Sequence, residues 1–278
     1  MYLKIKTTIL FFSITLYSLA GNENNNSGAA SVGMGNASVS FSDLWSVGNN
    51  QAGLAYQKNS SAGIYYDNKF LLKELSYKAI VAAMPVKGGT IGITAGNFGY
   101  KNYRENKYGL AFAKIFGENF SAGIQIDYLS THIGEEYGTK GSAVAEAGVL
   151  FKPIKNLTIG VHIYNISRTK LNEYANERIP TLLRLGGNYK FSDKTIVAIE
   201  TAKNIDKPIQ FKCGFEYMAV KDLFIRAGIS TNPSQCSFGF GFKIKNIKID
   251  IASSYHAVVG FTPALSVSYD FSKPISEK

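Results

Sequence analysis

The chain has 278 residues, of which 45% are apolar and only 18% charged, with a formal net charge of +10. This length suits one large domain or two small ones. The charged share is low for a soluble protein, and the abundance of tyrosine, phenylalanine and glycine favours strands and tight turns over helices. A basic chain can bind nucleic acid, but the export signal described next makes an anionic lipid surface the expected counter-charge.

Residues 1–20 have the pattern of a secretory signal peptide. Lys4 and Lys6 give it a basic start, an apolar run follows, and Ser18 and Ala20 are the small residues that a signal peptidase requires. We expect this segment to be removed. An uncleaved anchor helix is the alternative, although the apolar run is short for one.

Residues 33–56, GMGNASVSFSDLWSVGNNQAGLAY, match neither the signal peptide nor the alternating pattern that follows them. They carry the only tryptophan, Trp45, among small and amide residues. Small residues suit close packing in a confined space. We therefore predict that residues 21–58 form a polar leader and a plug, or hatch, seated inside the domain that follows.

From residue 59 to residue 271 the chain shows about 14 segments that alternate apolar residues with polar or small ones, which predicts strands with two unlike faces. Tight turns alternate with longer connections, as in an outer-membrane meander with short periplasmic turns and longer outer loops. Residues 272–278 would then be a periplasmic tail. The longer connections are expected at residues 101–106, 132–140, 167–180, 204–207, 231–235 and 257–262.

The two strand faces decide between a soluble sandwich and a membrane barrel. A sandwich turns its apolar face inward, whereas an outer-membrane barrel turns that face towards lipid. Strands of about 10 residues that end in tyrosine or phenylalanine favour the membrane. Because unpaired strand edges are too costly in lipid, the sheet must close. We predict an all-β fold, a transmembrane antiparallel β-barrel of about 14 strands with outer-membrane lipid as a partner.

Strand parity turns a set of acidic and basic side chains into the lumen. They could pair with one another and fill the barrel, or they could form a selectivity ring or a docking surface for the plug. Acids and bases are interleaved, so a pore field of a single sign is not indicated. The set is Asp127, Glu146, Arg184, Glu200, Lys212, Glu216, Arg226 and Asp250.

Catalytic and metal sites have little support in the sequence. Ser254 and His256 share a strand face, as in some barrel lipases, but no third orienting group accompanies them, so we expect a polar lumen pair. Cys213 and Cys236 lack metal-ligand spacing, and whether they form a disulfide stays open. We expect no enzyme activity, no cofactor, no metal and no nucleic-acid partner.

The plug segment resembles the amino-terminal segments of two barrel groups. The matching residues are Gly33-Met34-Gly35-Asn36-Ala37, Asp43-Leu44-Trp45-Ser46 and Asn50-Gln51-Ala52-Gly53-Leu54-Ala55, with Gln51 where proline is usual. The groups are the FadL-like outer-membrane transporters of hydrophobic compounds and the PorV/PorQ-like proteins of type IX secretion in Bacteroidetes. The resemblance implies a 14-strand barrel with this hatch in its lumen.

The two groups imply different functions for such a barrel. In the transporter group the hatch contacts a hydrophobic ligand that leaves sideways through the wall, and in the secretion group the barrel docks partner or cargo proteins. We predict a FadL-like channel for small hydrophobic compounds in the outer membrane of a Gram-negative cell, with protein docking or a structural role as alternatives. The candidate hatch and ligand residues are Met34, Asn36, Trp45, Asn49, Asn50, Leu54, Phe98 and Tyr100. Phe98 and Tyr100 have lumen parity unless a bulge returns them to the lipid side.

Overall fold

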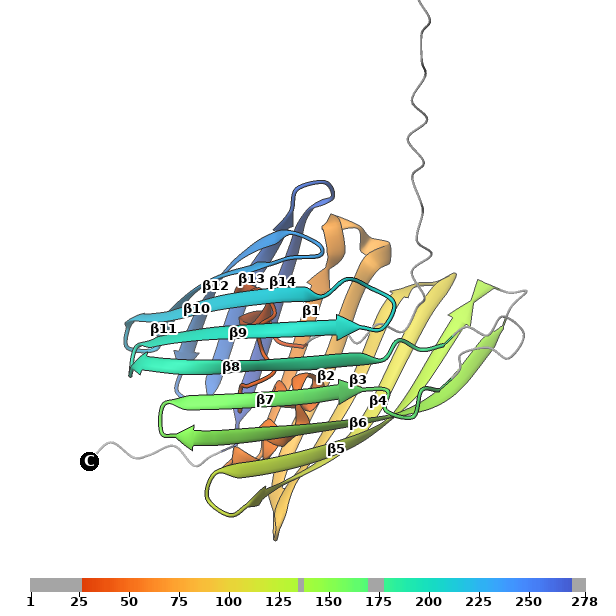
Figure 1. Ribbon diagram of the computed structural model, residues 1–278. Helices are drawn as coiled ribbons and strands as arrows, with labels where there is room; N and C mark the ends of the chain where they lie inside the picture. Colours follow the sequence, from red (N-terminus) through yellow and green to blue (C-terminus); the bar gives the residue numbers. More distant parts are fainter. Residues whose placement is uncertain (1–26, 135–137, 170–177, 272–278) are drawn as a thin grey trace, which may run out of the picture.

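The computed structural model describes residues 27–134, 138–169 and 178–271 (Figure 1). The expected signal peptide and the expected C-terminal tail lie outside these residues. So do the leader up to residue 26 and most of the connection expected at residues 167–180.

The described residues form 14 strands that close into one antiparallel barrel, as predicted. Each strand pairs with its neighbours in sequence, and β1 pairs with β14 to close the sheet. The strands are β1 (Ser61–Asn68), β2 (Ser76–Val86), β3 (Gly89–Tyr100), β4 (Tyr103–Phe116), β5 (Phe120–Ile133), β6 (Thr139–Ile154), β7 (Leu157–Tyr164), β8 (Leu182–Ser192), β9 (Thr195–Asn204), β10 (Gln210–Val220), β11 (Leu223–Ser230), β12 (Gln235–Ile244), β13 (Ile247–His256) and β14 (Gly260–Asp270).

The helices of the described residues are all short. None of them has both the length and the apolar character needed to cross a membrane. Three belong to the plug and two to the connection between β1 and β2. They are α1 (Ala29–Gly33), α2 (Ser46–Asn49), η1 (Gln51–Tyr56), η2 (Lys69–Leu71) and η3 (Lys73–Leu75).

The barrel wall is apolar outside and polar inside. On β12, Phe238 and Phe240 are 50% and 46% exposed, whereas the intervening Gly239 and the preceding Ser237 are buried. A band of such exposed apolar side chains surrounds a lumen that holds most of the buried polar ones, together with clusters of apolar side chains. This inversion is the pattern of a barrel that meets lipid with its outer face, and it confirms the predicted orientation of the faces.

The connections differ at the two ends of the barrel. One end has turns of two or three residues. The other end carries mostly longer loops, but its β3–β4 turn spans only residues 101–102 and its β13–β14 turn only residues 257–259. The connection expected at residues 257–262 shrinks to three residues, because β14 begins at Gly260, and the longer connection expected at residues 101–106 is wrong. Arg104 and Asn106 point outward there, beyond the apolar band, so polar residues on both faces hide the strand period. By the usual asymmetry of outer-membrane barrels we expect the short turns at the periplasmic side, and this orientation stays a prediction.

The plug lies inside the barrel (Figure 1). Helix α1 packs against β11 to β14, and η1 packs against β3 to β6. Wall glycines give it room, because a Cβ atom at Gly148 would collide with the Asn50 side chain and one at Gly228 with the backbone of Gly35. The segment expected as a turn at Asn49–Leu54 is helical instead, since the side chain of Asn50 accepts a hydrogen bond from the Ala52 N–H at 3.2 Å and caps η1.

Candidate functional site

Two wall residues on β8 and β9 hold the middle of the plug. Arg184 and Glu200 form a bidentate pair, with Nε–Oε1 and Nη2–Oε2 distances of 2.8 and 3.0 Å. The Oε2 atom of Glu200 also accepts the backbone N–H groups of Ser38 and Val39 at 2.8 and 2.9 Å. Arg184 donates to the carbonyl of Asn49 and to the Ser38 hydroxyl, each at 2.9 Å. A buried charge is tolerated when it is paired and fully hydrogen-bonded, and the plug completes that bonding.

A second acidic centre on β6 contacts the plug through Gln51. Glu146 accepts hydrogen bonds from Lys107 Nζ at 2.5 Å and from Gln51 Nε2 at 2.8 Å, and its Oε2 atom lies 2.9 Å from His162 Nε2. Lys107 also lies 3.3 Å from Asp127. Gln51 stands where proline is usual in the groups that the plug resembles. Its amide therefore supplies a plug-to-wall hydrogen bond that a proline side chain cannot make.

The remaining predicted lumen charges form a third cluster. Arg226 on β11 pairs with Glu216 at 2.6 Å and with Asp250 at 2.8 Å. The structure thus places the whole predicted set of lumen charges inside the barrel and in ion pairs. The two possibilities that the sequence left open, pairing and plug docking, coexist at Arg184 and Glu200. A role as a selectivity ring stays a prediction.

The candidate apolar residues do not share one open cavity. Trp45 and Leu54 are 2% and 0% exposed and lie in one packed cluster, against which the partly buried Phe98 rests. Met34 belongs to a separate cluster with Ala37 and Ala198. Tyr100 is 47% exposed at the end of β3. The apolar side of the plug is therefore filled by side chains.

The plug asparagines have different environments. Asn49 donates to the carbonyl of Ser27 at 3.0 Å, and Asn50 donates to the carbonyl of Val39 at 2.7 Å, so both hold the plug together internally. Asn36 instead adopts a left-handed backbone with φ 60°, and its side chain borders an open pocket. Its buried Oδ1 atom has no hydrogen-bond partner among the described residues.

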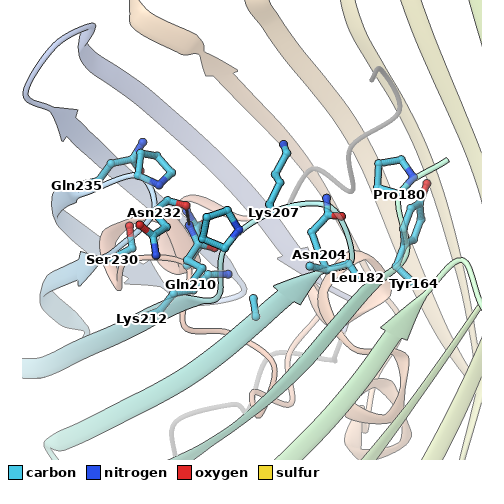
Figure 2. Close-up of a pocket in the computed structure, with 15 residues that line it drawn as sticks. Tyr164, Pro180, Leu182, Asn204, Lys207, Gln210, Lys212, Ser230, Asn232 and Gln235 are labelled. Atoms are coloured by element: carbon cyan, nitrogen blue, oxygen red, sulfur yellow. Dashed lines mark hydrogen bonds between the residues drawn. The ribbon is translucent and has the colours of Figure 1, made fainter. Parts of the chain in front are cut away.

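This pocket lies on the loop side of the plug and has a volume of about 250 Å³ (Figure 2). Its lining includes Asn36 of the plug and Lys212, a wall residue that pairs with Glu200 at 2.9 Å. Its apolar lining residues include Tyr164, Pro180 and Leu182, and its polar ones include Asn204, Gln210, Ser230, Asn232 and Gln235. The pocket therefore offers a solute both an apolar surface and hydrogen-bonding groups.

Sequence reasoning identified two of these lining residues, Asn36 and Lys212, but missed the rest. Tyr164 could have been found, because it follows the inward-facing His162 by two residues on β7. Leu182, Gln210 and Gln235 lie at strand ends, where alternation no longer separates the faces.

The other candidate sites take structural roles. The Nδ1 atom of His256 accepts hydrogen bonds from the N–H groups of Val258 and Val259 at 3.1 and 3.4 Å. These bonds give the histidine ring a structural role in the hairpin turn between β13 and β14. Cys213 and Cys236 are free and face outward on either side of β11, two strand spacings or about 10 Å apart, which is too far for a disulfide. In the described ranges, no group of three or more metal-binding side chains gathers.

Comparison with known proteins shows similarity in structure only. No family model matches the chain, and no curated protein matches it. The CymD monoaromatic hydrocarbon channel has 14% identity and a TM-score of 0.69, over 89% of this chain and 98% of its own. A Pseudomonas aeruginosa FadL homologue has 12% identity and a TM-score of 0.67, over 89% and 99%. The Pseudomonas putida toluene transporter TodX has 12% identity and a TM-score of 0.63, over 87% and 96%. The chain therefore has the barrel fold of these proteins.

Proposed function

We propose that this protein is an outer-membrane channel for small hydrophobic compounds. The observation that carries the proposal is the fold, which matches a monoaromatic hydrocarbon channel and a toluene transporter over 89% and 87% of the chain. These neighbours are channels and transporters, in keeping with the expectation that the chain is not an enzyme. The resemblance of residues 33–56 to the FadL-like hatch supports the same function.

The lumen supports a gated route rather than an open pore. A solute entering from the loop side reaches the pocket above the plug, where Tyr164 and Leu182 offer apolar contact. Beyond it stands the plug, which Arg184 and Glu200 bind through its backbone. Passage therefore requires the plug to shift or the wall to part, and the FadL-like resemblance implies sideways exit.

Uptake of labelled toluene by cells that produce the protein tests this proposal. Ser230 is buried and lines the pocket, whereas Ser253 lies on the outer face of β13. We expect Ser230→Trp to fill the pocket and to lower the initial uptake rate severalfold, while the matched control Ser253→Trp retains the rate of the unsubstituted protein. Uptake no faster than in cells without the protein would contradict the channel function. Equal rates for both variants would contradict the route through the pocket.

Protein docking in a secretion system is the second candidate, and only the motif in residues 33–56 favours it. Its test is separate from the uptake assay. A docking barrel would copurify in stoichiometric amount with a secreted or secretion-system protein, and deletion of its gene would lower the amount of that protein at the cell surface. Normal surface delivery after deletion would exclude this function.

A further inference from the structure

The outer face of β1 to β4 has a hollow with an apolar row and a polar row. The hollow measures about 330 Å³. The cross-strand register places Ile64, Ile80, Ala95 and Tyr108 side by side on successive strands. The next outward-facing row towards the loops contains Lys78, Asn97 and Asn106, again on neighbouring strands.

The apolar row explains the hollow. Ile80 and Tyr108 are 62% and 52% exposed and project from the wall, whereas Ala95 between them has only a methyl group. A long apolar object can therefore lie against Ala95 between two larger side chains. In a membrane-spanning barrel, the object at this position is an acyl chain.

The polar row marks the boundary of the apolar band. Asn97 donates to Asn106 at 2.8 Å, and Ser130 continues the row on β5. One step closer to the loops, Arg104 on β4 faces His132 on β5. The outward residues thus change from apolar to polar at Lys78 and Asn97, the level at which lipid head groups begin.

Two cations stand at this boundary. Lys78 and Arg104 are exposed, and within the described parts of the chain neither forms an ion pair. Lys78 and Arg104 are separated by two strand spacings across the sheet and by two residues along it, roughly 12 Å in all, so their long side chains can reach one group between them. The outward-facing Lys203 on β9 differs, because its Nζ atom donates to the carbonyls of Ile205 and Lys207 at 3.5 and 2.5 Å.

We propose that this hollow binds a phosphate-bearing lipid of the outer leaflet. One acyl chain lies along Ala95 between Ile80 and Tyr108. The phosphate lies at the polar row, where Lys78 and Arg104 supply charge-assisted hydrogen bonds. The apolar part of the hollow matches the acyl chain of an anionic lipid, and the two cations at its boundary match the phosphate.

Native mass spectrometry of the full chain, purified in detergent and titrated with dioleoylphosphatidylglycerol, tests the head-group half. We expect one tightly retained lipid. The double variant Lys78→Gln/Arg104→Gln should bind it roughly tenfold more weakly, because two charge-assisted contacts are lost. The matched control Lys114→Gln/Lys203→Gln removes two outward-facing lysines elsewhere and should bind normally. Equal weakening in both double variants would overturn the proposal.

Two further comparisons test whether the lipid occupies the hollow and whether its phosphate is needed for binding. Ala95→Phe should fill the hollow and displace the lipid, whereas Ala145→Phe on the outer face of β6 should not. Dioleoylglycerol, which lacks the phosphate, should be retained roughly tenfold less. Equal retention of dioleoylglycerol, displacement by inorganic phosphate at millimolar concentration, or full binding to Ala95→Phe would each refute a lipid site of this kind. The heat-dependent shift in gel mobility of a folded barrel verifies that every variant is folded.

Discussion

Substitution of Arg184 should release the plug before the barrel unfolds. Arg184→Met keeps an extended side chain but removes the bidentate pair with Glu200 and the bonds to Asn49 and Ser38. Breaking a buried pair on one side costs about 3–5 kcal/mol. Lys212 stays 2.9 Å from Glu200 and still neutralises part of the negative charge of Glu200. We therefore expect the free energy of plug docking to fall by about 3 kcal/mol, which is roughly a 100-fold lower ratio of docked to released plug.

Trp45 provides a readout that is specific for the plug. It is the only tryptophan of the chain, it is 2% exposed, and its ring packs edge-on to Tyr65 at a centroid distance of 6.1 Å. In Arg184→Met the red shift of its emission should occur at a lower urea concentration, while the gel mobility of the folded barrel persists. Arg104→Met, an outward-facing arginine, serves as the control and should change neither signal. Coincident plug and barrel transitions in Arg184→Met, at unchanged urea concentrations, would show that this ion pair does not hold the plug.

Three further substitutions test the packing between plug and wall. Gln51→Pro should keep η1, because proline is favoured at the first position of a helix, but should lose the bonds to Val47 and Glu146 and weaken docking by about 1 kcal/mol in the Trp45 transition. Gly148→Val should loosen the plug more than Gln51→Pro, since its side chain collides with Asn50, and the outward-facing Ala147→Val should leave the transition unchanged. Equal transitions for the two valine variants would contradict this packing. Oxidation should not crosslink Cys213 to Cys236, and a non-reducing gel that showed an intramolecular disulfide would refute their separation across β11.

The barrel could be predicted because its physical rule is local. An outward residue must be apolar to meet lipid, and the inward residue next to it is commonly small or polar, as in Ser237 to Phe240. Where it repeats along a strand, this alternation reveals both the strand period and the direction of each face. It fails at Arg104 and Asn106, which lie beyond the apolar band, and there the predicted connection was wrong.

The pocket could not be predicted, because its lining residues come together only when the barrel closes. Tyr164 on β7, Gln210 on β10 and Gln235 on β12 are far apart in the sequence, and the lumen face imposes no rule on where space remains. Whether Trp45 and Leu54 would line a ligand site or pack against the wall depended on the same closure. The wall residues Tyr65 and Val81 complete their cluster, which leaves Trp45 and Leu54 only 2% and 0% exposed.

The lumen charges show why parity gives the direction of a side chain but not its partners. A buried carboxylate has more acceptor sites than one base can fill, so an ion pair between neighbouring strands leaves part of its capacity unused. Glu200 uses this capacity to accept from Arg184 and Lys212 on the adjacent strands, and from Ser38 and Val39 of the plug. The wall contacts follow from strand order and parity. The plug contacts depend on backbone N–H groups, which every residue except proline carries, and therefore leave no signature in the side-chain pattern.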